Sequence, residues 1–558
     1  MKNNIKTITA VLLAILLLLG LWQLIHPFYP AQNWSFKRQT QTRILLVPLD
    51  GRPPCKQFVI DAGLIAGIEI ITPPSNLQDY YSQAGDTNGM RQWLLDNANG
   101  ADAVIISIDQ LLYGGLLAAR EKDLPAAESE NLITFLKDFH AKYPAISLYA
   151  FSILPRQTPQ DTIDGYQERK DLLEYSRLTG RKAAGLAIDE TRLANLKASI
   201  PPASLSRYLS HFTKNEKLNE QLIKLAQENI LTQLILGQDD GEPFSIPNIE
   251  KEHFRKYILQ NSLAADKVFL THGADEIALD ILAKINNQHQ QFSPRIYVDY
   301  NASSTPAAIM PYMAIDTAAT VSEKIAMLGG IQVSAPTEAD FILYISANDA
   351  NTISSRLETV KKLQTYQKNA QPVALVDLSK HFSAKETVLP LLIENNYPLN
   401  SLLAYAGWNT TSNAIGTSLA EASLYLGTCR QAQTVANARE IAACNIAFLQ
   451  NRLLEDYFYL KEDIDVINHT LQKAGYINTA DLDIEHNYRW ANRMLQQTML
   501  KHIAVYKQTK AFRKPVEFTS PAGNFTLMLQ DISADMSYPW PRTFEIWLHT
   551  TPFFAIPQ

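Results

Sequence analysis

Two adjacent aspartates, Asp239 and Asp240, carry the sharpest chemical signal in this sequence of 558 residues. They follow the apolar run Leu231–Leu236 and a Gly-Gln pair, and a further glycine comes directly after them. Adjacent side chains point to opposite faces of a regular strand, but a strand end flanked by glycine can bend so that both carboxylates face one pocket.

Two carboxylates that share a pocket cannot both ionise easily, so the pKa of one of them rises. A neutral carboxylic acid beside an ionised one is what general acid catalysis at a glycosidic oxygen requires. We therefore predict that Asp239 and Asp240 are catalytic. The alternative is a turn in which Asp239 caps the loop that holds Asp240.

Polar residues also follow most of the other apolar runs of the chain. The site of a parallel α/β fold lies at the carboxyl ends of its strands, where loops leave the sheet. Asp is also a common helix N-cap after a strand, so each residue taken alone has a cap or turn as an equal alternative. The whole set contains more carboxylates than turns require and predicts a substrate-binding pocket. Its members are Asp50, Arg52, Asp109, Tyr113, Arg156, His272, Asp275, Glu276, Asp299, Asn301, Trp408 and Asn409.

Several of these residues have a structural interpretation as well. Asp50 and Arg52 lie in a proline-rich loop, where they can pair with each other or bind hydroxyl groups. Asp275 and Glu276 precede a helical pattern, so they fit an N-cap and a first-turn acid as well as a catalytic role.

Glycine and tryptophan give two further signals near the ends of runs. The pair Gly114-Gly115 follows Tyr113 and allows close approach to a ligand, or equally close packing of a helix on a strand. Trp408 offers a flat apolar face for a sugar ring, with the Asn409 amide as a partner for hydroxyls, and core packing of the indole is the alternative.

These residues need a scaffold of alternating strands and helices. Continuous apolar runs separated by amphipathic stretches are typical of buried parallel strands joined by crossover helices. A closed barrel and a doubly wound sheet fit this pattern equally well, and we expect a barrel-like (β/α) domain. The expected strands are 43–50, 68–71, 103–109, 148–154, 231–236, 267–272, 295–299, 339–346, 372–377 and 402–406, and the clearest helical stretches are 128–143, 162–178, 216–228, 249–261 and 276–286.

The order of these patterns predicts five parts of an α/β protein. Residues 1–42 form an anchor and linker, 43–294 the barrel-like domain, and 295–427 a second α/β part. Residues 428–512 read as a helical region, and 513–558 as a small tail of strands and loops.

The N-terminal segment Ile8–Ile25 contains eighteen residues without a charge, preceded by Lys2 and Lys6. Eighteen residues span about 27 Å in a helix, enough for a hydrocarbon core of about 30 Å. The segment runs into a His-Pro-Phe-Tyr-Pro sequence without a small-residue cleavage site, which favours an uncleaved anchor over a cleaved signal peptide. We expect a single-pass membrane protein whose body is extracytoplasmic.

Composition and missing motifs narrow the function classes. Lys and Arg total 50 and Asp and Glu total 56, so a net charge of −6 without a long basic run argues against nucleic acid as a partner. The three cysteines, Cys55, Cys429 and Cys444, have no metal spacing and are too few for a disulfide framework. GxSxG, HExxH, P-loop and GxGxxG motifs are missing, so we expect no metal and no cofactor. The sequence does not indicate an oligomeric state.

The chain resembles the bacterial domain-of-unknown-function family 4127. The shared landmarks are PLDGRP (48–53), DxxxYGGL (109–116), GQDD (237–240), GADE (273–276) and GWNT (407–410). An Asp-Asp pair followed by a Trp-Asn loop is also similar to the substrate-assisted N-acetylhexosaminidases. That similarity implies that Asp239 orients the acetamido group of the substrate and that Asp240 is the acid/base.

Three functions fit these observations. The first is a membrane-tethered glycoside hydrolase acting on a glycan, with an N-acetylhexosaminide as a candidate substrate. The second is a metal-dependent hydrolase or phosphoesterase, in which Asp50, Asp109, Asp239, Asp240 and His272 bind the ion. The third is a non-catalytic glycan-binding protein of the cell envelope.

Overall fold

The computed structural model describes residues 38–159, 165–348 and 353–555. The expected anchor, Ile8–Ile25, lies outside these residues. Among the helices that are described, none combines the length and apolar character needed to cross a membrane.

Six parallel strands form the first sheet, and each coincides with an apolar run of the sequence. Their inward residues alternate between two cores: Ile44 and Leu46 face one, and Leu45 and Val47 face the other. A strand covered on both faces is apolar at every position, which explains the uninterrupted runs. The strands are β1 (Thr42–Val47), β2 (Ile68–Ile71), β3 (Ala103–Ser107), β4 (Ser147–Leu154), β5 (Gln233–Gln238) and β6 (Val268–His272), in the order β2-β1-β3-β4-β5-β6.

The expected α/β class with parallel strands is confirmed, but this sheet is open where we expected a barrel. Strands β2 and β6 lie at its edges, and no pairing between them closes the sheet in the described chain. Closure requires hydrogen bonds around the full circle, usually over eight strands. The seventh strand instead begins a separate sheet, so the first sheet ends at six.

The second sheet has five parallel strands in the order β11-β10-β9-β7-β8. In both sheets the first strand along the chain pairs with the second on one side and with the third on the other. Strand β8 was not expected, because its three residues are largely exposed and lack an apolar run. The strands are β7 (Arg295–Tyr300), β8 (Ile331–Val333), β9 (Phe341–Ala347), β10 (Val373–Leu378) and β11 (Ala404–Ala406).

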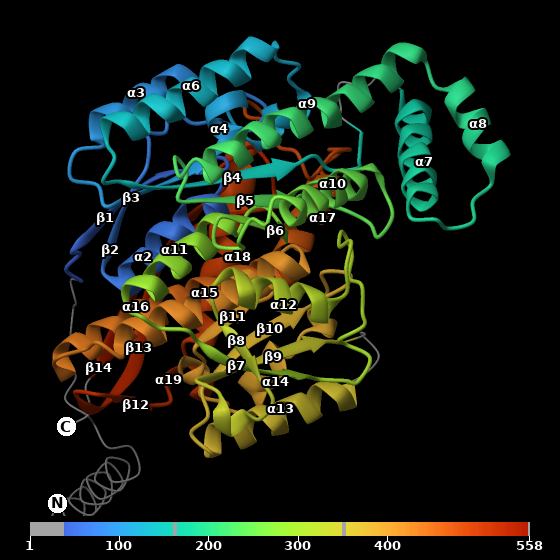
Figure 1. Ribbon diagram of the computed structural model, residues 1–558. Helices are drawn as coiled ribbons and strands as arrows, with labels where there is room; N and C mark the ends of the chain where they lie inside the picture. Colours follow the sequence, from blue (N-terminus) through green and yellow to red (C-terminus); the bar gives the residue numbers. More distant parts are fainter. Residues whose placement is uncertain (1–37, 160–164, 349–352, 556–558) are drawn as a thin grey trace, which may run out of the picture.

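Helices cover both faces of the first sheet (Figure 1). The outer face packs against α3 (Thr87–Asn97), α4 (Ile108–Tyr113), α6 (Ala126–Lys142), α9 (Pro202–Gln227) and α10 (Ile246–Gln260). The inner face packs against α2 (Gln57–Ala66) and α11 (Ile277–His289), which belong to the larger core shared with the second sheet.

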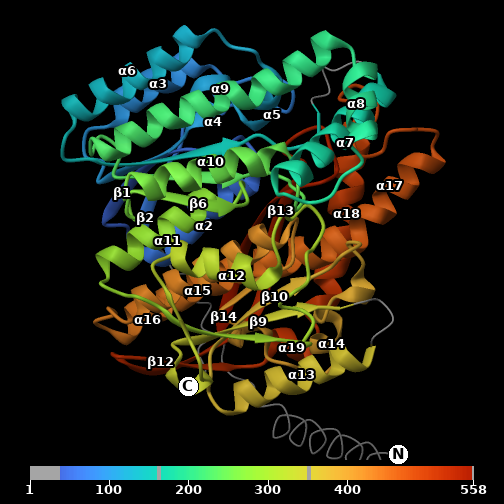
Figure 2. The same ribbon diagram turned by 45° about the vertical axis from the view of Figure 1, so that its right-hand side comes forward.

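Helix α15 (Thr411–Cys429) is the central helix of that larger core. All of its residues except Leu426 are buried, and it contacts α2, α11, α12, α16, β10 and β11. A helix that is apolar or small on every side is typical of such a fully enclosed position. Figures 1 and 2 show α15 and α16 (Val435–Leu453) between the two parallel sheets.

The C-terminal part consists of helices followed by a small antiparallel sheet, as expected. The remaining elements of this part are a π-helical segment (Leu454–Asp463), α17 (Ile464–Lys473), α18 (Tyr488–Tyr506), α19 (Lys510–Arg513), β12 (Val516–Ser520), β13 (Gly523–Ser537) and β14 (Trp547–Ala555). The other α-helices of the described residues are α5 (Leu116–Glu121), α7 (Tyr166–Ala183), α8 (Glu190–Ser199), α12 (Thr317–Met327), α13 (Ile353–Lys368) and α14 (Leu389–Glu394). Helices α7 and α8 project from the body and share a small separate core with the start of α9 (Figure 2).

Candidate functional site

A cavity of about 640 Å³ lies where loops from the carboxyl ends of both parallel sheets meet. The first sheet contributes the loops after β1, β2, β4, β5 and β6 together with α5. The second sheet contributes segments after β7, β10 and β11, and the connection between β13 and β14 adds Trp540, Arg542 and Phe544. The sequence-predicted residues that line this cavity are Arg52, Arg156, Asp239, Asp240, His272, Asp275 and Asn409.

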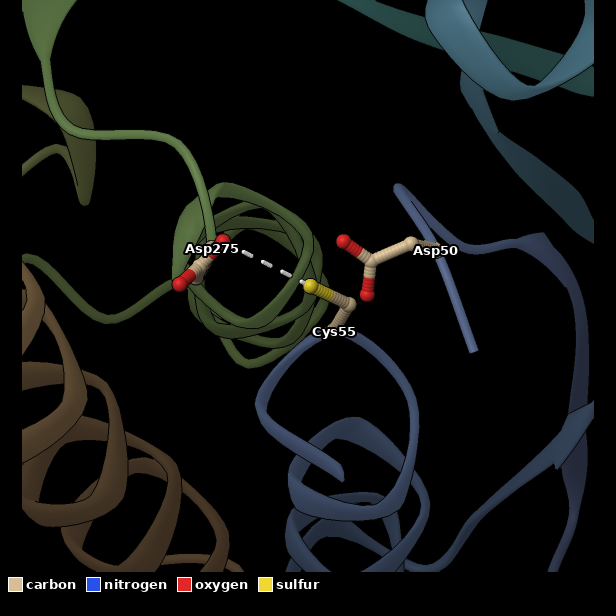
Figure 3. Close-up of side chains that lie close together, drawn as sticks. All are labelled: Asp50, Cys55 and Asp275. Carbon is tan, nitrogen blue, oxygen red and sulfur yellow. Dashed lines mark hydrogen bonds between the residues drawn. The ribbon is translucent and has the colours of Figure 1, made fainter. Parts of the chain in front are cut away.

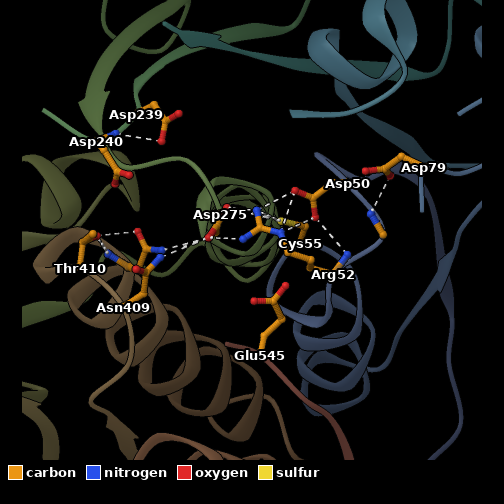
Figure 4. A network of polar contacts seen from close by, with 12 residues as sticks. Asp50, Arg52, Cys55, Asp79, Asp239, Asp240, Asp275, Asn409, Thr410 and Glu545 are labelled. Atoms are coloured by element: carbon orange, nitrogen blue, oxygen red, sulfur yellow. Dashed lines mark hydrogen bonds and ion pairs between the residues drawn. The ribbon is translucent and has the colours of Figure 1, made fainter. Parts of the chain in front are cut away.

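The Arg52 side chain links two acids from distant parts of the chain (Figure 4). Its guanidinium Nη2 lies 2.6 Å from Asp50 Oδ2 and 2.7 Å from Asp275 Oδ1. Burial alone would lower the pKa of Arg52, but the charges of Asp275 and Asp50 raise it well above its usual value. Asp50 is fully buried and lies behind Arg52, so it holds the arginine in place and does not line the cavity.

Cys55 completes a buried triad with the same two acids (Figure 3). Its sulfur lies 3.7 Å from Asp275 Oδ1 and 3.8 Å from Arg52 Nη2. Burial and the two carboxylate charges raise the pKa of the Cys55 thiol, which keeps it protonated and unreactive. The Arg52 guanidinium already compensates the two carboxylates, so the chain supplies its own cation at this point.

The paired aspartates occupy different environments at the end of β5. Asp239 accepts hydrogen bonds from both Nε and Nη2 of Arg120, a residue of α5, and its other oxygen accepts from the backbone N–H of Asp240 at 2.9 Å. Asp240 faces the cavity, and within the described chain no donor bonds its carboxyl group. The structure thus brings both aspartates to one wall and leaves only the second open to a ligand.

The pKa values of the pair move in opposite directions. Burial alone would raise the pKa of Asp239, but the charges of Arg120 and Arg156 hold it below its usual value. Burial and the charge of Asp239 raise the pKa of Asp240 to about 7, against the effect of the two arginines. Asp239 is therefore the ionised member and Asp240 the member that holds a proton near neutral pH.

His272 lines the cavity at the end of β6 and is held from behind. Its Nδ1 lies 2.8 Å from Glu323 Oε2, and its Nε2 lies 2.9 Å from Lys251 Nζ. Burial lowers the pKa of His272 and lowers that of Lys251 to about 8. Burial would raise the pKa of Glu323, but the hydrogen bond from His272 and the Lys251 charge lower it to about 2. The imidazole is neutral and fixed in orientation by two charged neighbours.

The amino end of α15 forms the opposite wall. The Thr410 side chain caps the helix by accepting from the backbone N–H of Asn413. The side-chain amides of Asn409 and Asn413 both donate to Asp275 Oδ2 at 3.4 Å. Asp275 therefore lies between Arg52 and these amides and presents an ion-paired carboxylate to the cavity (Figure 4).

Strained backbone clusters around this cavity. Among the described residues other than glycine, nine have positive φ, and four of them line the cavity. These are Tyr81 (φ 53°), Tyr312 (φ 63°), Phe382 (φ 53°) and Asn409 (φ 47°). Aromatic residues rarely adopt this conformation, and such strain accumulates where function requires a particular side-chain position. The cavity is therefore the best candidate for the functional site.

Asp109, Tyr113 and Glu276 lie behind the walls of the cavity. Asp109 is buried, its Oδ2 accepts from the backbone N–H of Ile153 at 3.0 Å, and burial raises its pKa to about 7. Tyr113 borders a small void next to Asp109 and Arg120. Glu276 is fully enclosed and pairs with Lys324, its Oε1 lying 2.5 Å from Nζ, so it stabilises the start of α11.

The glycine pair next to Tyr113 serves packing. A Cβ on Gly114 would lie 2.7 Å from the backbone oxygen of Gly85, and one on Gly115 would lie 2.6 Å from Asp79 Oδ2. Both glycines also have positive φ, so the loop after β2 can approach α4 and α5 only because these side chains are missing. Of the two roles predicted for the glycine pair, the structure therefore supports close packing, and the pair does not border the cavity where a ligand could approach it.

Trp408 lies in the core and not at the cavity, which corrects our expectation of a sugar-stacking surface. Its indole is 5% exposed, its Nε1 donates to Thr417 Oγ1 at 3.2 Å, and its ring packs edge-on against Phe58. At the end of β11 the chain turns into α15, so Trp408 and Asn409 point in different directions.

Asp299 and Asn301 belong to the second sheet and lie away from the cavity. Asp299 is bonded by Lys362 Nζ at 2.7 Å and by Tyr366 Oη at 2.5 Å, both from α13. The Asn301 side chain donates to Asn348 and accepts from the backbone N–H of Ala347. Both therefore stabilise the end of β7 and are not placed to bind a substrate in this cavity.

Several residues of the site were not predicted from the sequence. Arg120 lies inside a short helix with no motif around it, and the aromatic residues Tyr81, Tyr312 and Phe382 lie in irregular loops. Asp79 is buried beside Asp50, and burial together with the Asp50 charge raises its pKa to about 8. The Pro-Trp-Pro-Arg sequence at 539–542 was a visible signal in the tail, but only the fold brings it to the cavity.

The five residues proposed for a catalytic metal site are not gathered around one point. Asp50 is bonded to Arg52, Asp239 to Arg120, Asp109 to a backbone N–H and His272 to Glu323. In the described parts of the chain, potential metal-ligating side chains form two separate groups. Within each group, one ligand atom from every residue lies within 4.8 Å of the others. One is the Asp50–Cys55–Asp275 triad around Arg52, and the other lies on α9 and α10, away from the cavity.

The chain belongs to the family described as "Protein of unknown function (DUF4127)", which matches residues 44–549. This confirms the resemblance inferred from the sequence. The matched range contains nearly every strand and loop that forms the cavity. A comparison with curated proteins gives no match.

Proposed function

We propose that this protein is a glycoside hydrolase in which Asp240 is the general acid. The observation that carries the proposal is a carboxyl that no donor of the described residues bonds, with a pKa of about 7, placed in a cavity next to an ionised aspartate. General acids that act near neutral pH need such a raised pKa. A proton on Asp240 passes to the glycosidic oxygen as the bond between that oxygen and the anomeric carbon breaks.

The partner carboxylate in this proposal is Asp275 rather than Asp239. Both oxygens of Asp239 are already bonded, by Arg120 and by the backbone N–H of Asp240, so this side chain cannot also orient an acetamido group. Its negative charge instead raises the pKa of Asp240. Asp275 is bonded as well, by Arg52, Asn409 and Asn413, but the role proposed for it needs charge and no free oxygen. From the cavity wall, its negative charge stabilises the positive charge that develops at the anomeric carbon.

The remaining cavity walls support a sugar ligand. Tyr312, Phe382 and Phe544 border the cavity and offer ring faces for the apolar side of a sugar. Asn409 and Thr410 provide amide and hydroxyl partners for hydroxyl groups. Mixed aromatic and polar walls of this kind are typical of pockets for small polar ligands.

The segment Ile8–Ile25 supports a location for this activity. We propose that it anchors the protein in a membrane and that residues 43–558 act outside the cytoplasm on an envelope or environmental glycan. If this is correct, the protein remains with the membrane fraction, and external protease degrades the body in spheroplasts. Complete protection of the body would contradict this orientation.

The test of the activity is turnover of a panel of aryl glycosides, with N-acetylhexosaminides first. We expect release of the aryl group by the wild-type protein. Binding of glycans without turnover of any substrate would favour the glycan-binding alternative. Activity that chelation removes and a divalent ion restores would favour the metal-dependent alternative.

A further inference from the structure

A second cluster of chemically capable side chains lies on the outer helices α9 and α10, apart from the cavity. The Nε2 atom of His253 lies 3.1 Å from Glu220 Oε1 and 3.3 Å from Glu216 Oε1. One ligand atom from each of these three residues lies within 4.8 Å of the other two. Imidazole nitrogen and carboxylate oxygen are both common ligands of zinc.

The spacing of these residues suits a shared metal ion. Glu216 and Glu220 are four residues apart on α9, so their side chains project from the same face of that helix. Glu250 and His253 are three residues apart on α10, which gives a Glu-x-x-His pair on the helix packed against α9. Di-iron carboxylate bundles build their sites from single glutamates of two helices and a Glu-x-x-His pair from each of two others, and the cluster here contains one such pair.

Glu250 supplies an independent indication that a cation belongs here. Its side chain is 4% exposed, and neither of its carboxyl oxygens has a hydrogen-bond partner within the described chain. Among the described residues no lysine or arginine bonds it, and burial and the charge of Glu216 raise the pKa of Glu250 well above its usual value. A buried carboxylate is normally paired with a cation or coordinates a metal, and this one lies beside a cluster of metal-binding side chains.

We propose that Glu216, Glu220 and His253 bind one Zn²⁺ ion and that the carboxylate of Glu250, on the same helix as His253, is the fourth ligand. The ion would join α9 to α10 and offset most of the negative charge of the glutamates. Lys251 follows Glu250 on α10, and its Nζ contacts His272 at the cavity wall. Zinc at this position therefore also stabilises the helix that holds one wall of the cavity, whatever reaction the cavity performs.

The test is zinc binding by the full-length protein after dialysis against a chelator, measured by calorimetry, together with thermal unfolding. We expect one tight zinc site per chain and a higher melting temperature with zinc present. His253→Ala should lower the zinc affinity by at least about 10–100-fold, since changes even in outer-shell partners have effects of that size. Glu250→Gln, which keeps the shape of the side chain, should lower it about 10-fold.

The matched control is His486→Ala. His486 Nδ1 lies 2.9 Å from Asp483 Oδ2 on the surface. The substitution therefore removes an exposed histidine–carboxylate pair and leaves α9 and α10 unchanged. This variant should bind zinc as the wild type does. The proposal is wrong if the wild type has no tight site, if only Mg²⁺ or Ca²⁺ binds, or if Glu250→Gln and His253→Ala both bind zinc normally. Should His253→Ala fail to fold, Glu250→Gln alone decides the question.

Discussion

The two parallel sheets share the same kind of strand order, yet their carboxyl ends differ in chemistry. At the end of β5, Asp240 has a carboxyl in the cavity that no described donor bonds, while Asp239 beside it is bonded to the partly buried Arg120. At the end of β7, Asp299 is bonded by Lys362 and Tyr366 from the covering helix α13. The same residue type after a strand thus keeps a carboxyl open to a cavity in one place and is tied into the structure in the other, depending on which donors the neighbouring elements bring.

The largest expected difference between the two sheets is in the stability lost when the cation that bonds the strand-end aspartate is removed. These cations are Arg120 beside Asp239 and Lys362 beside Asp299. Arg120→Met leaves Asp239 buried without its partner, and breaking a buried pair in this way costs about 3–5 kcal/mol in the free energy of unfolding. Lys362→Met removes a side chain that is 45% exposed, so its cost should stay within about 0–1 kcal/mol. Denaturant unfolding of the two variants measures both values.

A second substitution checks that the loss in Arg120→Met comes from Asp239. The double variant Arg120→Met with Asp239→Asn removes the uncompensated charge and should recover part of the lost stability. Equal destabilisation of the single and the double variant would show that Arg120 contributes by packing alone.

Removing the carboxyl at the end of β5 and at the end of β7 should have different effects on turnover. Asp240→Asn removes the proposed proton donor and should lower turnover by at least about 10²-fold, the low end of general acid catalysis. Asp299→Asn changes a carboxylate that faces α13, so its turnover should be close to that of the wild type. Steady-state kinetics on the best aryl glycoside measures both.

The control for this pair is the fold of each variant, measured by circular dichroism. Near-wild-type turnover by a folded Asp240→Asn variant would remove Asp240 from the mechanism. A large loss in a folded Asp299→Asn variant would mean that the second sheet also contributes to the site.

The pH dependence of the reaction tests the raised pKa of Asp240. A general acid must be protonated, and burial and the Asp239 charge give this carboxyl a pKa of about 7. As far as this group controls the rate, turnover should therefore be constant below pH 7 and fall about tenfold for each pH unit above 7. Asp239, whose pKa is below its usual value, stays ionised over this range.

The reference for the pH profile is the residual activity of Asp240→Asn. That activity should lack the fall above pH 7, because the titrating group is gone. A descending limb that persists unchanged in the variant would assign the limb to another group, such as Glu545, whose pKa burial raises to about 7.

The smallest expected effects compare two aromatic residues that the sequence alone does not distinguish. Tyr312→Ala removes a ring from the cavity wall and should raise KM by about 3–10-fold, the worth of one aromatic contact of about 0.5–1.5 kcal/mol. Trp408→Phe removes a buried hydrogen bond to Thr417 and should lower stability by about 1–3 kcal/mol without changing KM. A raised KM in the folded Trp408→Phe variant would show that the indole contributes to substrate binding after all.

Strands could be predicted from the sequence where both of their faces are covered. Every expected apolar run became a strand, and only β8, which is short and exposed, was missed. The paired aspartates could be identified because they follow such a run, and the predicted split of their pKa values agrees with their environments. An apolar run reports burial but carries no information on its neighbours, so it could not separate an open sheet from a barrel.

Residue types and their spacing along the chain determined the parallel α/β class, the positions of the strand ends and the set of polar residues that follow them. The tertiary structure alone decided that Arg120 neutralises Asp239, that Asp240 stays open, and that Trp408 turns into the core while Tyr312 and Trp540 reach the cavity region. The physical reason is that protonation and exposure depend on which groups meet through space. Arg120 and Asp239, for example, are 119 residues apart, and no local sequence pattern indicates their contact.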